Sequence, residues 1–134
     1  MKKILLLIIL PVLIFAQTLD VNNFTTDIFS KIDKAPKQVK MSLIIVGSYV
    51  KDENYKIIDA LNVVIGSFYV ENLITSKGKE DFKKLLIEYA AKKYSVDIDN
   101  IYIQKFEISQ NPSTDDIINA LEESGCCKNN SQHP

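Results

Sequence analysis

The sequence predicts an α+β domain in which a small antiparallel sheet carries two to three helices on one face. Two patterns lead to this prediction. Hydrophobic residues alternate with a period of two in residues 37–50 and 101–108, as in strands that place one face on a core. Between them, in residues 52–93, hydrophobic residues recur every three or four positions, as in amphipathic helices. The predicted order is strand, strand, helix, helix, strand, helix.

The first 16 residues are typical of a signal peptide. Two lysines precede residues 4–16, which contain no charged or polar side chain. A membrane-spanning helix needs about 20 apolar residues, so this run is short for one. The small residue Ala16 predicts cleavage after that position, which would leave Gln17 as the first residue. The alternative is that residues 1–16 stay attached as a short membrane anchor; either way we expect a bacterial protein in the periplasm, at or near the inner membrane.

The composition indicates one acidic domain with few side chains suited to catalysis, metal binding or nucleic-acid binding. The chain has 134 residues and a formal charge of -1, and all 16 of its cations are lysines. Without arginine or a basic surplus it is a poor nucleic-acid binder. Its single histidine and two cysteines are too few for a multi-residue zinc site. Cleavage after Ala16 would leave 118 residues with 14 lysines, 17 acidic residues and a charge of -3.

Two neighbouring segments predict a β-hairpin. Residues 21–31 are rich in β-branched and aromatic side chains, and 33–36 carry a proline turn signal. Residues 37–50 form the most regular strand pattern in the chain. Its apolar side consists of Val39, Met41, Leu43 and Ile45. Gly47 marks a bulge or a close approach of another backbone.

Two helices are expected next. The first runs to about residue 72 and contains Gly66, which indicates close packing or a loosened turn. The second is capped by Thr75 or Ser76, whose side-chain oxygen can accept a free backbone N–H. It ends near two lysines at 92–93, where cations oppose the negative end of the helix dipole.

A turn at 97–100 leads to the strand 101–108. A last short helix is capped by Ser113 or Thr114 and stopped by Gly125. Its apolar side consists of Ile117, Ile118 and Leu121. The predicted domain therefore covers residues 17–125, and 126–134 form a flexible tail.

The chain offers little catalytic chemistry, and we expect a non-enzyme without a cofactor or a bound metal. His133 lies one residue from the C-terminus, whereas a catalytic base needs a fixed geometry. The adjacent Cys126 and Cys127 could form a strained internal bridge, an intermolecular bridge or no bridge. Together with His133 they could also hold a soft metal such as copper(I).

Three segments resemble the periplasmic domain of FliL, the flagellar basal-body-associated protein. They are residues 59–68, 73–80 and 101–108, and the likeness extends over roughly residues 37–108. The family pattern is a strand, a helix ending in a Leu-Thr-x-x-Gly-Lys/Arg-Glu turn, a second helix and a closing aromatic strand. Here the matching positions are Asp59, Asn62, Leu73, Thr75, Gly78, Lys79, Glu80, Tyr102 and Phe106.

The resemblance implies a stomatin-like domain that sits beside the flagellar stator and supports its function. It further implies a homo-oligomer, basal-body partners and no catalytic residues; the matched positions would be structural. Three departures from the family are visible. The chain starts with a signal-like stretch in place of a cytoplasmic segment and a full transmembrane helix, carries Lys77 where an acid is common, and continues beyond the closing strand.

The departures keep two other hypotheses open. One is a periplasmic thiol or metal-handling protein that acts through Cys126 and Cys127. The other is a generic envelope adaptor that shares only the fold. Membrane association stays open as well, because it depends on whether residues 1–16 are cleaved.

Overall fold

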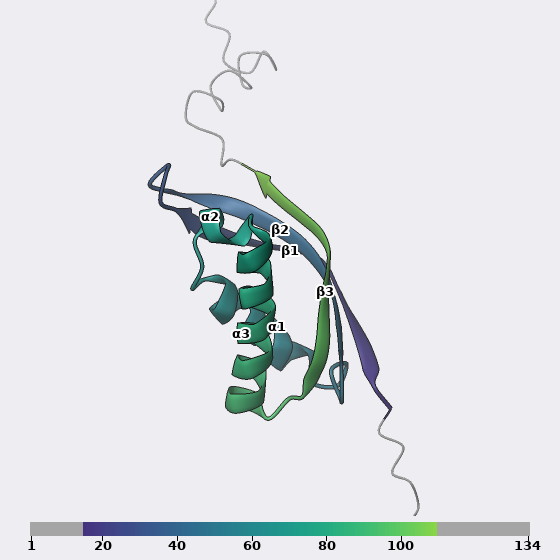
Figure 1. Ribbon diagram of the computed structural model, residues 1–134. Coiled ribbons are helices and arrows are strands. Elements are labelled where there is room, and N and C mark those ends of the chain that lie inside the picture. The colour runs from purple at the N-terminus through teal and green to yellow at the C-terminus, as the bar shows by residue number, and fades with distance from the viewer. Residues whose placement is uncertain (1–14, 110–134) are drawn as a thin grey trace, which may run out of the picture.

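The computed structural model describes residues 15–109, which form one sheet covered by helices (Figure 1). The elements are β1 (Gln17–Ser30), β2 (Ala35–Gly47), α1 (Asn54–Ile65), α2 (Val70–Leu73), α3 (Ser76–Tyr94) and β3 (Ile98–Ser109). The sheet is antiparallel with the order β1-β2-β3, and the helices lie on one of its faces. This confirms the predicted α+β class. The expected last helix and the cysteine tail lie outside the described residues.

The core forms between the inner face of β2 and the helices. The alternating residues predicted for this face are fully or almost fully buried: Val39, Met41, Leu43 and Ile45. The helices contribute the residues at three- and four-residue spacing that point toward the sheet: Ile57, Leu61, Val64, Ile65, Phe82, Leu86 and Ala90. Fully burying one large aliphatic side chain stabilises a fold by about 1.5–3 kcal/mol, so this layer dominates the stability.

β1 and β3 are longer than predicted, whereas β2 runs over Ala35–Gly47 instead of the predicted 37–50, because residues 48–50 form a turn. β1 begins at Gln17 rather than at residue 21, and it contains a bulge between Val21 and Phe24. Asn23 has a φ of 54° there, which asparagine tolerates better than most residues. The bulge separates two regular stretches of pairing with β2, so the strand continues on both sides of it.

The turn predicted at 97–100 is wrong, because β3 already starts at Ile98. Gly47 pairs with Ile98 at this end of the sheet, and Ser48 N–H donates a 3.1 Å hydrogen bond to Asp97 O. A Cβ on Gly47 would lie 2.2 Å from that same carbonyl oxygen. The pairing with β3 also shifts register between Val46 and Gly47, so the glycine lies both at a bulge and at a close backbone approach, the two features that the sequence indicated.

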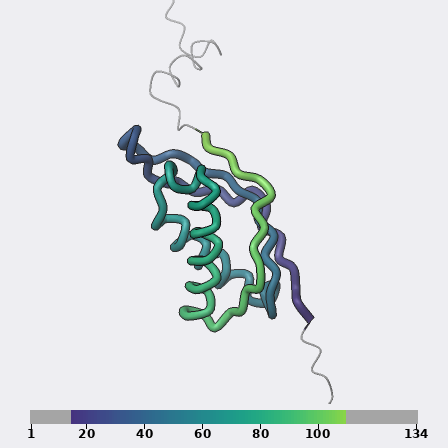
Figure 2. The backbone as a smooth tube through the Cα atoms, viewed as in Figure 1, coloured from purple at the N-terminus to yellow at the C-terminus, as the bar shows by residue number. Residues whose placement is uncertain are grey.

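The long first helix predicted up to residue 72 is also wrong. α1 ends at Ile65, and Gly66 is its C-terminal cap. The Gly66 N–H still bonds to Asn62 O, but Ser67 and Phe68 turn back onto the last turn of α1. The chain then makes the separate short helix α2 before α3 begins. Figure 2 shows the path of the backbone from α1 through α2 to α3.

None of the helices within residues 15–109 combines the length and the apolar content needed to cross a bilayer.

Candidate interaction site

The turn between α2 and α3 holds two of the family-motif residues in a capping geometry. Thr75 Oγ1 accepts a 2.9 Å hydrogen bond from Gly78 N–H and donates a 2.7 Å bond to Asn72 O. The N-terminus of α3 therefore has a side-chain cap, as the sequence predicted for this position. A Cβ on Gly78 would lie only 1.7 Å from Asn72 O, so no larger residue fits without moving the backbone.

Of the motif residues around this turn, Lys79 and Glu80 lie near β3. Leu73 is fully buried below the turn. Lys79 places its Nζ 5.0 Å from the centre of the Phe106 ring, which joins α3 to β3 by a cation–π contact. Glu80 forms an exposed ion pair of 2.9 Å with Lys83. Tyr102 stays 49% exposed on β3.

The two motif residues on α1 have different contacts. Asn62 Nδ2 donates a 2.9 Å hydrogen bond to Ile58 O within its own helix. Asp59 accepts a hydrogen bond from the Tyr94 hydroxyl at the end of α3. This bond stabilises the protonated phenol and raises the pKa of Tyr94 to about 12. Asp59 therefore joins α1 to α3.

Hydrogen bonds to Glu71, which we call the Glu71 bridge, connect the β1–β2 hairpin to α2, and the sequence did not reveal them. Glu71 on α2 accepts a 2.5 Å hydrogen bond from the buried Ser30 hydroxyl. Its carboxylate also accepts bonds of 3.1 Å and 3.3 Å from the backbone N–H groups of Lys31 and Ile32. These donors favour the ionised form and lower the pKa of Glu71 to about 2. The partners are about 40 residues apart in sequence, so no local pattern could indicate them.

Four apolar side chains are exposed around this bridge, and we call them the tip patch. Phe29, Ile32, Tyr69 and Ile74 are 48%, 78%, 39% and 53% exposed. Phe29 and Tyr69 meet edge to face at 6.4 Å, and the Lys31 ammonium lies 4.1 Å from the Tyr69 ring centre. Clustered exposed apolar residues on a folded domain indicate a contact surface for another macromolecule.

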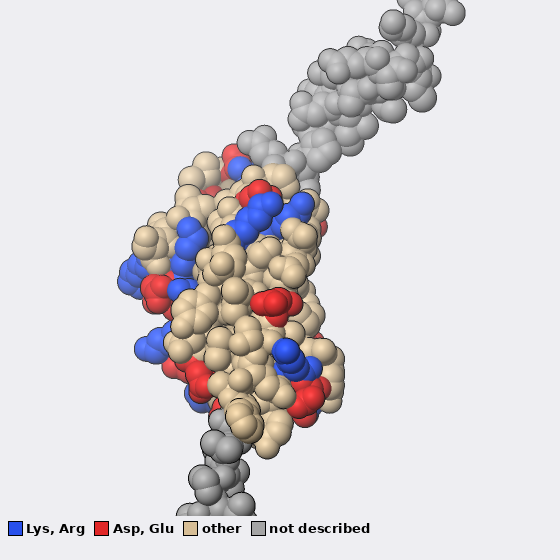
Figure 3. Space-filling view, turned by 90° about the vertical axis from the view of Figure 1, so that its right-hand side faces the viewer, with Lys and Arg blue, Asp and Glu red and all other residues tan. Residues whose placement is uncertain are grey.

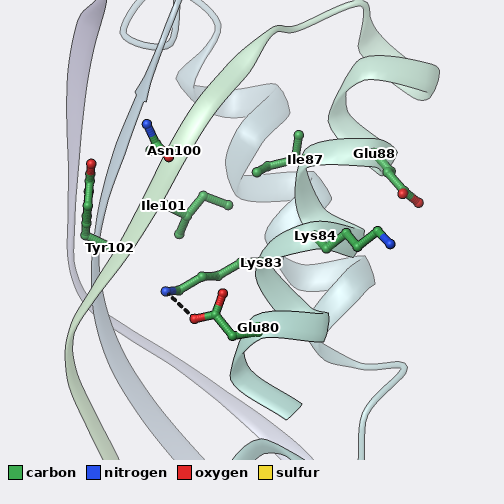
Figure 4. Close-up of a pocket in the computed structure, with 8 residues that line it drawn as sticks. All are labelled: Glu80, Lys83, Lys84, Ile87, Glu88, Asn100, Ile101 and Tyr102. Atoms are coloured by element: carbon green, nitrogen blue, oxygen red, sulfur yellow. Dashed lines mark hydrogen bonds and ion pairs between the residues drawn. The ribbon is translucent and has the colours of Figure 1, made fainter. Parts of the chain in front are cut away.

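A second surface feature, the α3–β3 groove, runs between these two elements. It consists of two neighbouring hollows of about 460 and 350 Å³, and Glu80 and Lys83 line both. In the first hollow Ile87 of α3 and Ile101 of β3 face the space between the elements, while Lys84 and Glu88 lie at its outer rim (Figure 4). Acidic and basic side chains are interspersed on the face of the molecule in Figure 3.

The tip patch and the α3–β3 groove are the candidate contact surfaces of the described domain. Among residues 15–109, no group of three or more His, Cys, Asp or Glu side chains is placed to hold a metal ion. The predicted thiol residues Cys126 and Cys127 lie outside the described part of the chain, as does His133. No protein-family model matches the chain, and neither does any curated protein.

Proposed function

We propose that the protein is a non-enzymatic, FliL-like component of the bacterial flagellar motor that supports the stator or basal body from the periplasm. The observation that carries the proposal is the turn at residues 73–80. Thr75 and Gly78 take up the tight cap between two helices there, and Lys79 continues toward the closing strand at Phe106. These residues are among those on which the sequence resemblance rests.

The surface supports a role in binding. The tip patch exposes aromatic and aliphatic side chains at the end of the hairpin, next to the lysine at position 31. Side chains of this kind carry most of the energy in protein interfaces when a partner buries them. We therefore assign contact with a stator or basal-body protein, or with another copy of this chain, to the tip patch.

The test is a deletion strain examined for swimming in normal and viscous medium, together with localisation of a fluorescent fusion at the motor. We expect reduced swimming in viscous medium and foci at the flagellar base. Normal swimming in both media, without motor foci, would contradict the proposal.

Complementation of that strain separates a motor role from a general envelope role. The native chain should restore swimming, whereas Ile32→Asp should not, because it places a charge in the tip patch at its most exposed residue. Tyr55→Ser is the matched control, since Tyr55 is 64% exposed but lies on α1. A chain with Cys126→Ser and Cys127→Ser should swim normally; failure of this variant would favour the thiol-based alternative.

A further inference from the structure

The Gln17 side chain links the start of β1 to the turn that follows β2. Its Oε1 accepts a 3.0 Å hydrogen bond from Lys51 N–H, and its Nε2 donates a 3.2 Å hydrogen bond to a carboxylate oxygen of Asp52. These partners lie 34 and 35 residues further along the chain. Both polar atoms of the side-chain amide are therefore engaged, although Gln17 is the first residue of the strand.

The fold anchors both ends of this link. On the strand side, Gln17 pairs with Gly47 of β2. On the turn side, Val50 is fully buried in the core, and the Glu53 N–H donates a 2.9 Å hydrogen bond to Tyr49 O. The side-chain amide of Gln17 is therefore held between two parts of the chain that the fold fixes relative to each other.

A glutamine at the N-terminus has a reaction of its own. The predicted cleavage after Ala16 makes Gln17 the first residue, so that its backbone nitrogen becomes a free amine. In its unprotonated form this amine attacks Cδ of the same side chain. The bond between Cδ and Nε2 breaks, and Nε2 leaves as ammonia with the proton that the amine loses. The product is the lactam pyroglutamate, and the reaction consumes no oxidant, cofactor or second substrate.

The hydrogen bonds of the folded chain oppose this reaction. Cyclisation expels Nε2, so the hydrogen bond to Asp52 is always lost. The attack also brings Cδ within bonding distance of the Gln17 backbone nitrogen, whereas the folded chain holds the amide at Lys51 and Asp52. Hydrogen bonds to a charged group such as the Asp52 carboxylate are stronger than those between neutral groups. Ring formation therefore has a higher barrier in the folded chain than in the unfolded chain.

We propose that Gln17 is a site of pyroglutamate formation that folding controls. The unfolded processed chain cyclises, and Lys51 and Asp52 keep the glutamine open once the domain has folded. The proposal rests on the predicted cleavage after Ala16 and is independent of the proposed motor function. The open form retains the hydrogen bonds between β1 and the turn at residues 48–53.

The processed chain, residues 17–134, tests this proposal, and it contains every described helix and strand. It is released from an N-terminal fusion by a protease that leaves Gln17 first, and is then kept at neutral pH either folded or in urea. Mass spectrometry of the N-terminal peptide follows the loss of one ammonia. We expect the folded chain to cyclise at least about tenfold more slowly than the chain in urea, because it must break two hydrogen bonds. Equal rates would overturn the proposal.

Substitutions of Asp52 test the cause of the protection. Asp52→Ala should speed cyclisation of the folded chain several-fold and leave the rate in urea unchanged. Asp52→Asn keeps an oxygen that accepts from Nε2 and should retain most of the protection. Asp99→Ala is the matched control, because Asp99 is an exposed acidic residue at the same end of the sheet.

Circular dichroism establishes that each variant is folded before its cyclisation is measured. An Asp52→Ala chain that cyclises no faster than Asp99→Ala would overturn the proposal. A protein from the envelope that still begins with Met1 would overturn it as well, because Gln17 then has no free amine.

Discussion

Gly78 and Gly66 both lie at helix ends, but their surroundings differ. A Cβ on Gly78 would lie 1.7 Å from Asn72 O, whereas the nearest atom to a Cβ on Gly66 is Asn62 O at 3.4 Å. Gly66 also has a right-handed helical backbone, with a φ of -66°. Gly78 therefore leaves no room for a side chain, whereas a side chain fits at Gly66.

Gly78→Ala should lower the free energy of unfolding by at least about 2 kcal/mol, because backbone atoms must move to make room for the methyl group. Gly66→Ala should raise it by about 0.4–1 kcal/mol, because alanine restricts the unfolded chain at a position that suits it. Urea unfolding followed by circular dichroism measures both variants. Equal stabilities of the two would show that the tight turn at Asn72 is not the reason for the glycine.

At the scale of elements, Glu71 connects α2 to the β1–β2 hairpin. The Glu71 carboxylate accepts hydrogen bonds from the Ser30 hydroxyl and from the backbone N–H groups of Lys31 and Ile32, at the start of the hairpin turn. α2 has only four residues, so these bonds contribute to fixing its position together with the buried Leu73. Two tip-patch residues, Phe29 and Ile32, lie on the hairpin that Glu71 holds.

Because the hairpin donors favour the ionised form of Glu71, we expect the free energy of unfolding to fall in acid. The pKa of Glu71 is about 2 in the folded chain and near its ordinary value of 4.5 in the unfolded chain. A lowered folded pKa means that the stabilisation is complete above about pH 4.5 and is lost as the pH falls toward 2. Glu71→Gln should remove this part of the pH dependence, as measured by urea unfolding between pH 2 and 6. An unchanged slope in the variant would exclude Glu71 as the source.

For the whole molecule, the predicted signal peptide and the described domain meet at Gln17. β1 starts at this residue, and its side-chain amide donates a 3.2 Å bond to Asp52 and accepts a 3.0 Å bond from Lys51 N–H. The predicted cleavage after Ala16 would leave β1 complete, because it removes nothing that pairs with β2.

The protein isolated from the envelope should therefore begin at Gln17. Intact-mass measurement distinguishes this form from the 134-residue chain. A substitution of Ala16 by a bulky residue, Ala16→Phe, should block processing and leave the longer form in the membrane fraction. Recovery of a chain that still begins with Met1 from native cells would favour the membrane-anchor alternative.

Local patterns in the sequence were enough to predict most elements. The alternation around Val39–Ile45 indicated the core strand because side chains of a strand point to opposite faces, and Thr75 indicated a helix start because its oxygen can accept a backbone N–H. The element ends were predicted less well. Gly66 was placed inside a helix, and residues 97–100 in a turn, because local spacing does not show where a distant strand will pair.

The sequence by itself thus determined the α+β class, the buried face of β2 and a cap of α3 at Thr75 or Ser76, since each depends on residues close together in the chain. The tertiary structure alone decided the Glu71 bridge, the contact of Asp59 with Tyr94, the tip patch and the α3–β3 groove. Each of these joins residues separated by tens of positions. Their proximity follows from how the helices pack on the sheet, which no local pattern encodes.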